Sequence, residues 1–273
     1  MTAFLLVCSG ILGLLIGSFL NVVAYRVPAG LSIVSPGSAC PGCHTPISAR
    51  DNVPLVSWAL LRGRCRHCDM RIPVRYPLVE GLTAVAFVLA AMPFAAPLSS
   101  PAPTLDTVSQ ALELVAFLYL AAVSVVLAVI DIDTRRLPDR IVLPSYAVGA
   151  ALLGGAGILR GDAASLLVAL VGAVAAAGFF LLLHLVGGMG LGDVKLAGVV
   201  GLFLGYLGVA QLTVGIAAGF AVGALAGIAL MVVTGRSRKT AIPFGPWILA
   251  GAWIGVLAGG PLAAGYLRLT GLA

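Results

Sequence analysis

Val123-Ser-Val-Val-Leu-Ala-Val-Ile130 carries no charge and is followed at once by Asp131. Apolar runs of this kind recur along the 273 residues, of which 60% are hydrophobic and only 10% charged. A helix needs about 20 apolar residues to cross a bilayer, and lipid requires the backbone groups of a span to be paired internally. The runs do not alternate as barrel strands would. The sequence therefore excludes a water-soluble globular domain and predicts an all-α, polytopic membrane helix bundle.

Hydropathy predicts about eight transmembrane helices, at residues 3–23, 77–96, 110–130, 141–158, 164–186, 194–208, 211–233 and 244–260. The first is predicted to stay as a membrane helix, because it begins uncharged and runs directly into Arg26, unlike a cleaved signal peptide. Cys8, within this span, is predicted to be a small buried apolar residue. The sixth run is short, which allows a tilted or partly re-entrant course.

Basic residues are distributed unequally between the predicted loops. With eight spans, fourteen of them fall on one side of the membrane, and only Arg160 and Arg268 fall on the other. Cytoplasmic loops are enriched in Lys and Arg, so this side is predicted to be cytoplasmic and both termini to lie outside it. The rule also accounts for the net charge of +6, so we infer no nucleic-acid partner, although a basic face suits anionic lipid headgroups. The fourteen residues are Arg26, Arg50, Arg62, Arg64, Arg66, Arg71, Arg75, Arg135, Arg136, Arg140, Lys195, Arg236, Arg238 and Lys239.

A polar insert at residues 26–76 contains two CxxC pairs, Cys40/Cys43 and Cys65/Cys68. Two such pairs can present four thiolates in a tetrahedron, the arrangement of structural Zn²⁺ sites. A loop this small buries little apolar surface, and a metal would supply folding free energy that packing does not. The alternative is a redox pair or two disulfides, which a reducing cytoplasm disfavours. The pattern predicts a zinc-ribbon-like insert with these four ligands.

Two acids stand at the cytoplasmic ends of predicted spans. Asp131 ends the third span, and Asp193 follows the glycine-rich stretch Gly187–Gly192 and opens the sixth. Ionisable groups at membrane depth are costly and are functional candidates by default. Two neighbouring carboxylates do not both ionise easily, so one can hold a proton while the other activates water. The pair predicts an aspartyl peptidase site.

Other interpretations of these acids are open at this level. Asp193 can cap a helix, Asp131 can mark a helix end, and transporters also place carboxylates within bundles. Asp133 is predicted to lie in water, and Asp139, after Pro138, to begin the fourth span. His184 is predicted to be a packed helix residue, and no Ser-His or Cys-His constellation suggests a covalent mechanism.

Six motifs occur in the order typical of one family. The chain resembles the type IV prepilin peptidases, which belong with presenilin-like enzymes to the GxGD class of intramembrane aspartyl proteases. The resemblance covers essentially the whole chain and rests on Gly17-Ser-Phe-Leu-Asn-Val-Val23, the paired CxxC motifs, Arg75-Tyr-Pro-Leu-Val-Glu80, Ile130-Asp-Ile-Asp133 with Leu137-Pro-Asp139, Gly190-Leu-Gly-Asp193, and Pro243-Phe-Gly-Pro246.

The resemblance implies an enzyme of the cell (inner) membrane that removes basic leaders from prepilins or pseudopilins of type IV pili and type II secretion systems. It implies that Asp131 and Asp193 are catalytic, and that the enzyme N-methylates the new N-terminus with S-adenosylmethionine, whose binding residues are not assigned. The connection from Arg26 to Cys40 is shorter than in some relatives, which bears on methylation. The domains would be a first helix at 1–25, a cytoplasmic tetracysteine loop at 26–76 and an aspartyl peptidase domain at 77–273. The alternatives are a peptidase without methyltransferase activity and a membrane transporter with a zinc-containing loop.

Overall fold

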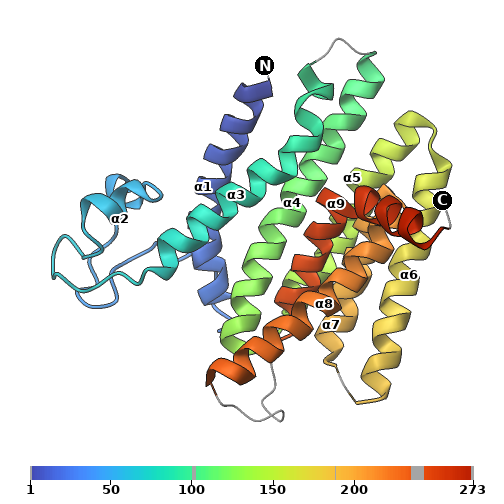
Figure 1. The fold of residues 1–273 in the computed structure, drawn as a ribbon. Helices are drawn as coiled ribbons and strands as arrows, with labels where there is room; N and C mark the ends of the chain where they lie inside the picture. The colour runs from blue at the N-terminus through green and yellow to red at the C-terminus, as the bar shows by residue number, and fades with distance from the viewer. Residues whose placement is uncertain (1, 100–102, 188, 235–242, 272–273) are drawn as a thin grey trace. The chain divides into compact units, whose positions relative to one another are not determined.

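The computed structural model describes residues 2–99, 103–187, 189–234 and 243–271 (Figure 1). These residues form helices joined by turns, with no strand among them apart from two isolated bridges. The prediction of an all-α bundle is confirmed. The helices are α1 (Thr2–Arg26), α2 (Val56–Leu60), α3 (Arg75–Ala95), α4 (Thr104–Thr134), α5 (Asp139–Arg160), α6 (Ala163–Leu185), α7 (Leu191–Leu207), α8 (Val209–Thr234) and α9 (Gly245–Thr270), with 3-10 turns at Ala49–Asn52 and Pro97–Ser99.

Seven of the described helices, all except α2 and α7, are long and apolar enough to cross a membrane. They match seven of the eight predicted spans. The eighth match is α7, whose 17 residues extend over about 25 Å at 1.5 Å per residue, somewhat less than the roughly 30 Å of a bilayer core. Its residues from Leu196 to Gly201 and from Phe203 to Tyr206 are buried, because α5, α6, α8 and α9 all pack against it. The short sixth span that was predicted is therefore α7, a buried helix on which α5, α6, α8 and α9 all pack.

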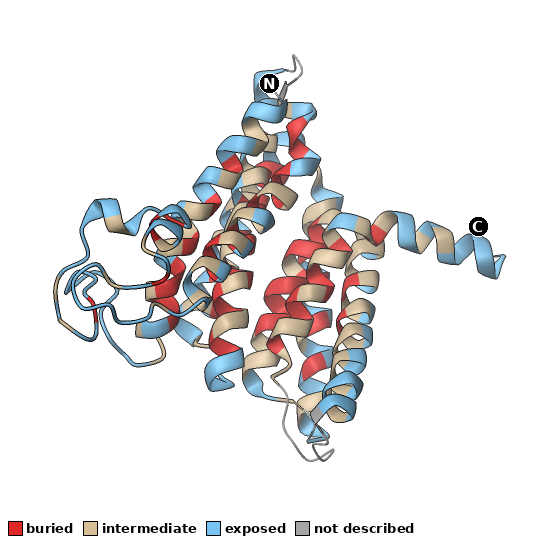
Figure 2. Ribbon diagram, turned by 60° about the vertical axis from the view of Figure 1, so that its left-hand side comes forward, coloured by how far each residue is buried: buried red, intermediate tan, exposed pale blue. Residues whose placement is uncertain are grey.

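The chain divides into two compact units. The first contains residues 1–103 together with 117–126 of α4, and the second contains 104–116 and 127–273. In the second unit α6 packs along α7 and α8 along α9. A β-carbon on Gly172 of α6 would lie 2.7 Å from the carbonyl oxygen of Gly201 on α7, so this pair approaches through the small residues that membrane helices use for close packing. Figure 2 shows buried residues along the inner faces of the helices.

In the first unit α1 packs against α3. A β-carbon on Gly17 would lie 2.7 Å from the Cα of Glu80, so the two backbones are in close approach. Cys8 precedes Gly17 by nine residues, which is about two and a half helical turns. It therefore lies on the opposite face of α1 from Gly17. It is exposed, and the expectation that it is buried was wrong because only one face of α1 is covered by α3.

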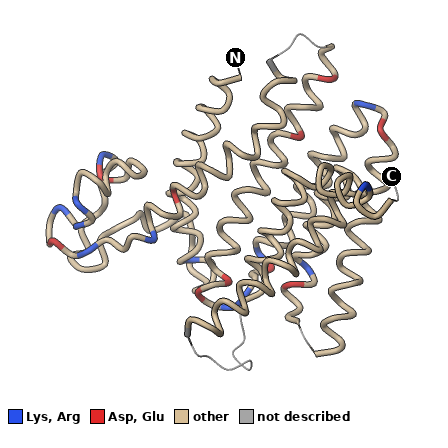
Figure 3. Tube along the Cα trace, in the orientation of Figure 1, with Lys and Arg blue, Asp and Glu red and all other residues tan. Residues whose placement is uncertain are grey.

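Charged residues of the second unit gather at the two ends of its helices (Figure 3). The last turn of α4 and the first turns of α5 and α7 share one end, where Arg135, Arg136, Arg140 and Lys195 belong. Arg160 ends α5 at the opposite end. The basic residues of this unit that were predicted to share one side of the membrane therefore share one end of the unit. Arg236, Arg238 and Lys239 lie outside the described residues.

Candidate active site and cysteine cluster

The two CxxC pairs adopt the same local structure, offset by 25 positions. The backbone N–H of Cys40 donates to Thr45 O at 3.0 Å, and that of Cys65 donates to Met70 O at 2.8 Å. The residue after each second cysteine, His44 or Asp69, has a positive φ of 57° or 56°. Each pair is closed by an isolated antiparallel bridge, Ala39 with Pro46 and Arg64 with Arg71. The insert is therefore an internal duplication in structure, with one knuckle from each half.

The four cysteine sulfurs converge on one centre. They all lie within 4.8 Å of one another, with Cys40 Sγ 3.7 Å from Cys68 Sγ and Cys43 Sγ 4.0 Å from Cys65 Sγ. A tetrahedron with Zn–S bonds of about 2.3 Å has sulfurs about 3.8 Å apart, so the donor set fits Zn²⁺. Hydrogen bonds from the backbones of Cys43 and Gly42 lower the pKa of the Cys40 thiol, which favours the thiolate that a metal binds.

The insert is fixed to α3 by a buried acid. Glu80 is 8% exposed, and its Oε2 accepts a 2.8 Å hydrogen bond from the backbone N–H of Leu55. Leu55 has a φ of 59°, and α2 begins at the next residue. Asn21 on α1 donates to the backbone oxygen of Tyr76 at 3.2 Å. The motif residues Asn21 and Glu80 therefore hold the base of the insert to the helices around it.

Asp131 lies in the second unit and is 4% exposed. Its Oδ2 accepts a 3.0 Å hydrogen bond from the backbone N–H of Gly245, the first residue of α9. A helix N-terminus leaves N–H groups unpaired and favours a negative charge. A β-carbon on Gly245 would lie 2.7 Å from that carboxylate oxygen, so a larger residue there would displace the carboxylate or the start of α9. The Pro243–Pro246 motif therefore supplies a donor to Asp131.

Asp193 stands in the first turn of α7. Its Oδ2 accepts from the backbone N–H of Gly190 at 3.2 Å, so the predicted capping interaction is present. The charge of Asp131 acts on the Asp193 carboxylate, so the two acids lie in the same region of the second unit. Leu137, in the turn between α4 and α5, packs beside Gly192 and Gly245: β-carbons on these glycines would lie 3.0 and 3.3 Å from its side chain. Gly192 precedes Asp193 and Gly245 donates to Asp131, so the absence of side chains at both glycines leaves room for Leu137.

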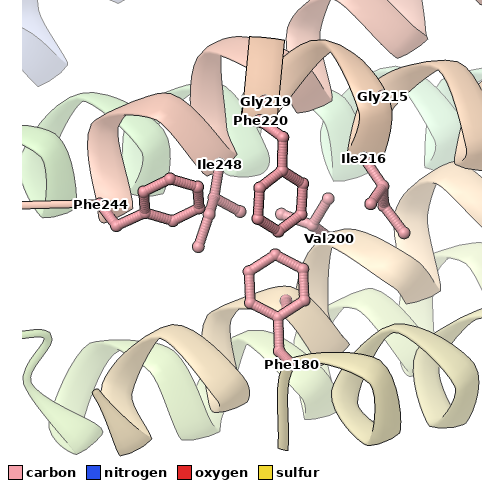
Figure 4. A pocket seen from close by; sticks show the side chains of 9 residues that line it. Phe180, Val200, Gly215, Ile216, Gly219, Phe220, Phe244 and Ile248 are labelled. Atoms are coloured by element: carbon pink, nitrogen blue, oxygen red, sulfur yellow. The ribbon is translucent and has the colours of Figure 1, made fainter. Parts of the chain in front are cut away.

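An aromatic cluster holds the segment that precedes Gly245. Phe180, Phe220 and Phe244 line an apolar pocket together with Ile248 (Figure 4). The ring centroids of Phe220 and Phe244 are 5.3 Å apart, and those of Phe180 and Phe220 are 5.5 Å apart, within the range of favourable aromatic pairs. The cluster ties α6, α8 and the start of α9 together, so it supports the position from which Gly245 donates.

Lys195, two residues beyond Asp193, joins α7 to α5. Its Nζ lies 2.8 Å from both carboxylate oxygens of Asp139, and its backbone oxygen accepts from the Tyr146 hydroxyl at 2.7 Å. Asp139 begins α5, as predicted. Asp133 is exposed, also as predicted. His184 is partly buried, and its Nδ1 lies 2.7 Å from Met189 O in the turn before α7, so it organises that turn.

Several residues around the site were not predicted from the sequence. Gly245 and Leu137 belong to sequence motifs, but the motifs do not indicate that Gly245 donates to Asp131 or that Leu137 packs beside Gly192 and Gly245. Away from the site, at the opposite end of α4, Glu113 was also not predicted, although an acid within the predicted span 110–130 is a signal. The duplication of the insert was also missed, although Ile47 and Ile72 recur at the same offset as the cysteines.

Comparison with known proteins covers most of the chain. Residues 11–94 match the model of the bacterial peptidase A24 N-terminal domain, and residues 118–235 match that of the type IV leader peptidase family. The prepilin leader peptidase/N-methyltransferase of Aeromonas hydrophila is 35% identical over 93% of this chain and 91% of its own length. Proteins of the same name from Pseudomonas putida and Neisseria gonorrhoeae are 34% and 33% identical, covering 98% and 93% of this chain and 96% and 91% of their own lengths. No solved structure matches the chain. With both domains in their expected order and relatives this similar over nearly the whole length, the chain belongs to the type IV leader peptidase family.

Proposed function

We propose that this protein is a prepilin leader peptidase that uses Asp131 and Asp193 as an aspartyl pair and N-methylates the product. What supports the proposal is that both acids belong to one unit and each accepts a hydrogen bond from a backbone N–H at the start of a helix, in a chain whose relatives are prepilin leader peptidase/N-methyltransferases. The substrates are prepilins or pseudopilins. The enzyme lies in the inner membrane, with the site at the cytoplasmic face, because the basic residues of the second unit share the end that holds both acids.

The chemistry requires one ionised and one protonated carboxylate. The ionised member removes a proton from water, and the resulting hydroxide attacks the scissile carbonyl while the protonated member donates to the carbonyl oxygen. Collapse of the tetrahedral intermediate breaks the C–N bond, and the amine leaves with a proton from the pair. Which member holds the proton is a property of the pair and not of either residue.

The four cysteines would hold a structural Zn²⁺, which would supply folding free energy to the insert and no step in cleavage. Methylation requires S-adenosylmethionine as donor of the methyl group to the new N-terminal amine. We assign no donor-binding residue. A transporter is disfavoured by the family to which the chain belongs. A peptidase that has lost methylation is the second candidate, favoured by the short connection between Arg26 and Cys40.

Coexpression with a prepilin, followed by mass spectrometry of the pilin, tests both activities. Asp131→Asn and Asp193→Asn are expected to abolish leader removal. Asp133→Asn is the matched control, because this acid is exposed and two residues from Asp131, and it should cleave normally. Near-normal cleavage by either site variant would refute the aspartyl pair. A product that is cut but lacks the gain of about 14 Da that comes from replacing an N–H hydrogen by a methyl group would favour the second candidate.

A further inference from the structure

The second unit contains a buried acid that the proposed chemistry does not use. Glu113, on α4, is 6% exposed. The Arg160 guanidinium donates to both carboxylate oxygens, with Nη1 2.6 Å from Oε1 and Nη2 3.0 Å from Oε2. The hydroxyl of Tyr206 also donates to Oε1, at 2.6 Å. This bidentate pair with a third donor satisfies the carboxylate away from water.

These contacts join three helices at the end of the unit opposite the aspartates. Glu113 belongs to α4, Arg160 to the last turn of α5 and Tyr206 to the last turn of α7. A second bond reinforces the tie, because Ser109 Oγ on α4 donates to Ala156 O on α5 at 3.0 Å. All of these residues lie in the second unit. The polar contacts therefore fix α4 to both helices at one level.

Helix geometry relates this level to the aspartates. Glu113 precedes Asp131 by 18 positions on α4, which is five full turns and about 27 Å, so the two acids share one face of that helix. Alpha-4 is 31 residues long and contains neither Gly nor Pro, the residues at which helices usually kink. Tyr206 follows Asp193 by 13 positions on α7, about 20 Å. The hydrogen bond between Glu113 and Tyr206 therefore fixes the position of Asp131 along the helix axis relative to Asp193.

The packing of α4 by itself does little to fix the axial position of Asp131 relative to Asp193. Alpha-6 and α7 are locked by backbone approaches at glycines such as Gly172 and Gly201, but α4 has no glycine to provide such a notch. Its apolar side chains are mostly Ala, Val and Leu, and lipid offers no hydrophobic driving force between helices. The carboxylate of Glu113 is buried while the Arg160 side chain is one-third exposed; ion pairs that involve a buried charge are weak evidence for stability, whereas fixing register is their best-attested role.

We propose that Glu113 is a positioning residue which, with Arg160 and Tyr206, fixes the axial register of α4 against α7 and so aligns Asp131 with Asp193. The inference rests on the proposed aspartyl pair. A slip of one residue would displace Asp131 by about 1.5 Å, and a misplacement of about 1 Å can cost roughly 100-fold in rate.

The test measures leader cleavage by the purified full-length enzyme across a range of pH. Glu113→Ala is expected to lower kcat about 100-fold with little change in KM, and to displace the pH–rate profile, because the titration of a coupled pair depends on the separation of its members. Tyr206→Phe removes only the bond to α7 and should lower kcat by about tenfold. The double variant should be no worse than Glu113→Ala, because both changes break one contact.

Leu153→Ala is the matched control for a loss of stability alone. Leu153 is buried on α5 and 1% exposed, so this variant should melt at lower temperature while its pH profile stays that of the wild type. The inference is overturned if Glu113→Ala and Tyr206→Phe keep the wild-type profile and kcat per folded molecule. Tyr206→Phe decides the matter alone if Glu113→Ala does not fold. Retained cleavage by Asp131→Asn would instead overturn the aspartyl pair, and the inference with it.

Discussion

Gly245→Ala is the substitution whose effect follows most directly from the structure. The added β-carbon would lie 2.7 Å from Asp131 Oδ2, where ordinary contact begins at 3.4 Å, so the carboxylate or the start of α9 must move by about 0.7 Å. The move also weakens the 3.0 Å hydrogen bond from the Gly245 N–H, and bonds to charged groups contribute about 1.5–3 kcal/mol. We expect kcat for leader cleavage to fall by about 10–100-fold, with KM nearly unchanged.

The assay is steady-state cleavage of a prepilin by purified enzyme, with thermal unfolding measured in parallel. Gly178→Ala is the matched control, because a β-carbon there meets nothing within 4 Å and alanine favours a helix interior. The control should cleave like the wild type and be at least as stable. If Gly245→Ala cleaves within twofold of the wild type, Asp131 does not depend on this donor and the proposed geometry of the site is wrong.

Three further predictions concern the insert. Purified protein should contain about one zinc per chain, and Cys43→Ser should abolish it and expose the insert to protease; unchanged zinc content would exclude the tetrathiolate site. The side chain of Arg66 lowers the pKa of Asp51 to about 2, below its ordinary value of 3.8, so this contact should stabilise the insert above about pH 4 and be lost as pH falls towards 2. Hydrogen exchange of the insert should show that loss in the wild type and not in Arg66→Ala; equal pH dependence in both would contradict it. Glu80→Ala should leave the Leu55 N–H without its acceptor at a cost of about 1–3 kcal/mol, seen as faster exchange of that amide, and an unchanged rate would contradict the contact.

Hydropathy anticipated most of the fold. Each long apolar run corresponds to a described helix, because length and apolarity are local properties and lipid imposes the same backbone solution on every span. Helix α7 is shorter than the other long helices because it is covered by other helices, so its length does not need to match the thickness of the bilayer core. The exposure of Cys8 could not be predicted, because the sequence does not say which face of α1 packs against α3.

The candidate site was anticipated in its acids and not in their surroundings. Asp131 and Asp193 were conspicuous because carboxylates are rare beside long apolar runs. Their partners depend on which segments pack together: Gly245 is 114 positions from Asp131, and no local pattern reports that distance in space. Glu113 did carry a signal, as an acid inside a span, but its pairing with Arg160 and Tyr206 follows from helix packing.

The sequence by itself determined that this chain is a helical membrane protein, that four cysteines form two like pairs, and that two acids stand at span ends. These features depend on composition and spacing alone. The hydration cost of apolar residues follows from composition, and the arrangement of metal ligands follows from the spacing of the cysteines. Only the tertiary structure decided that the Asp131 carboxylate meets the start of α9, that Leu137 packs beside Gly192 and Gly245, and that the buried carboxylate of Glu113 pairs with Arg160. Those contacts arise from close backbone approach and from the satisfaction of buried polar groups, which depend on how distant segments pack in three dimensions.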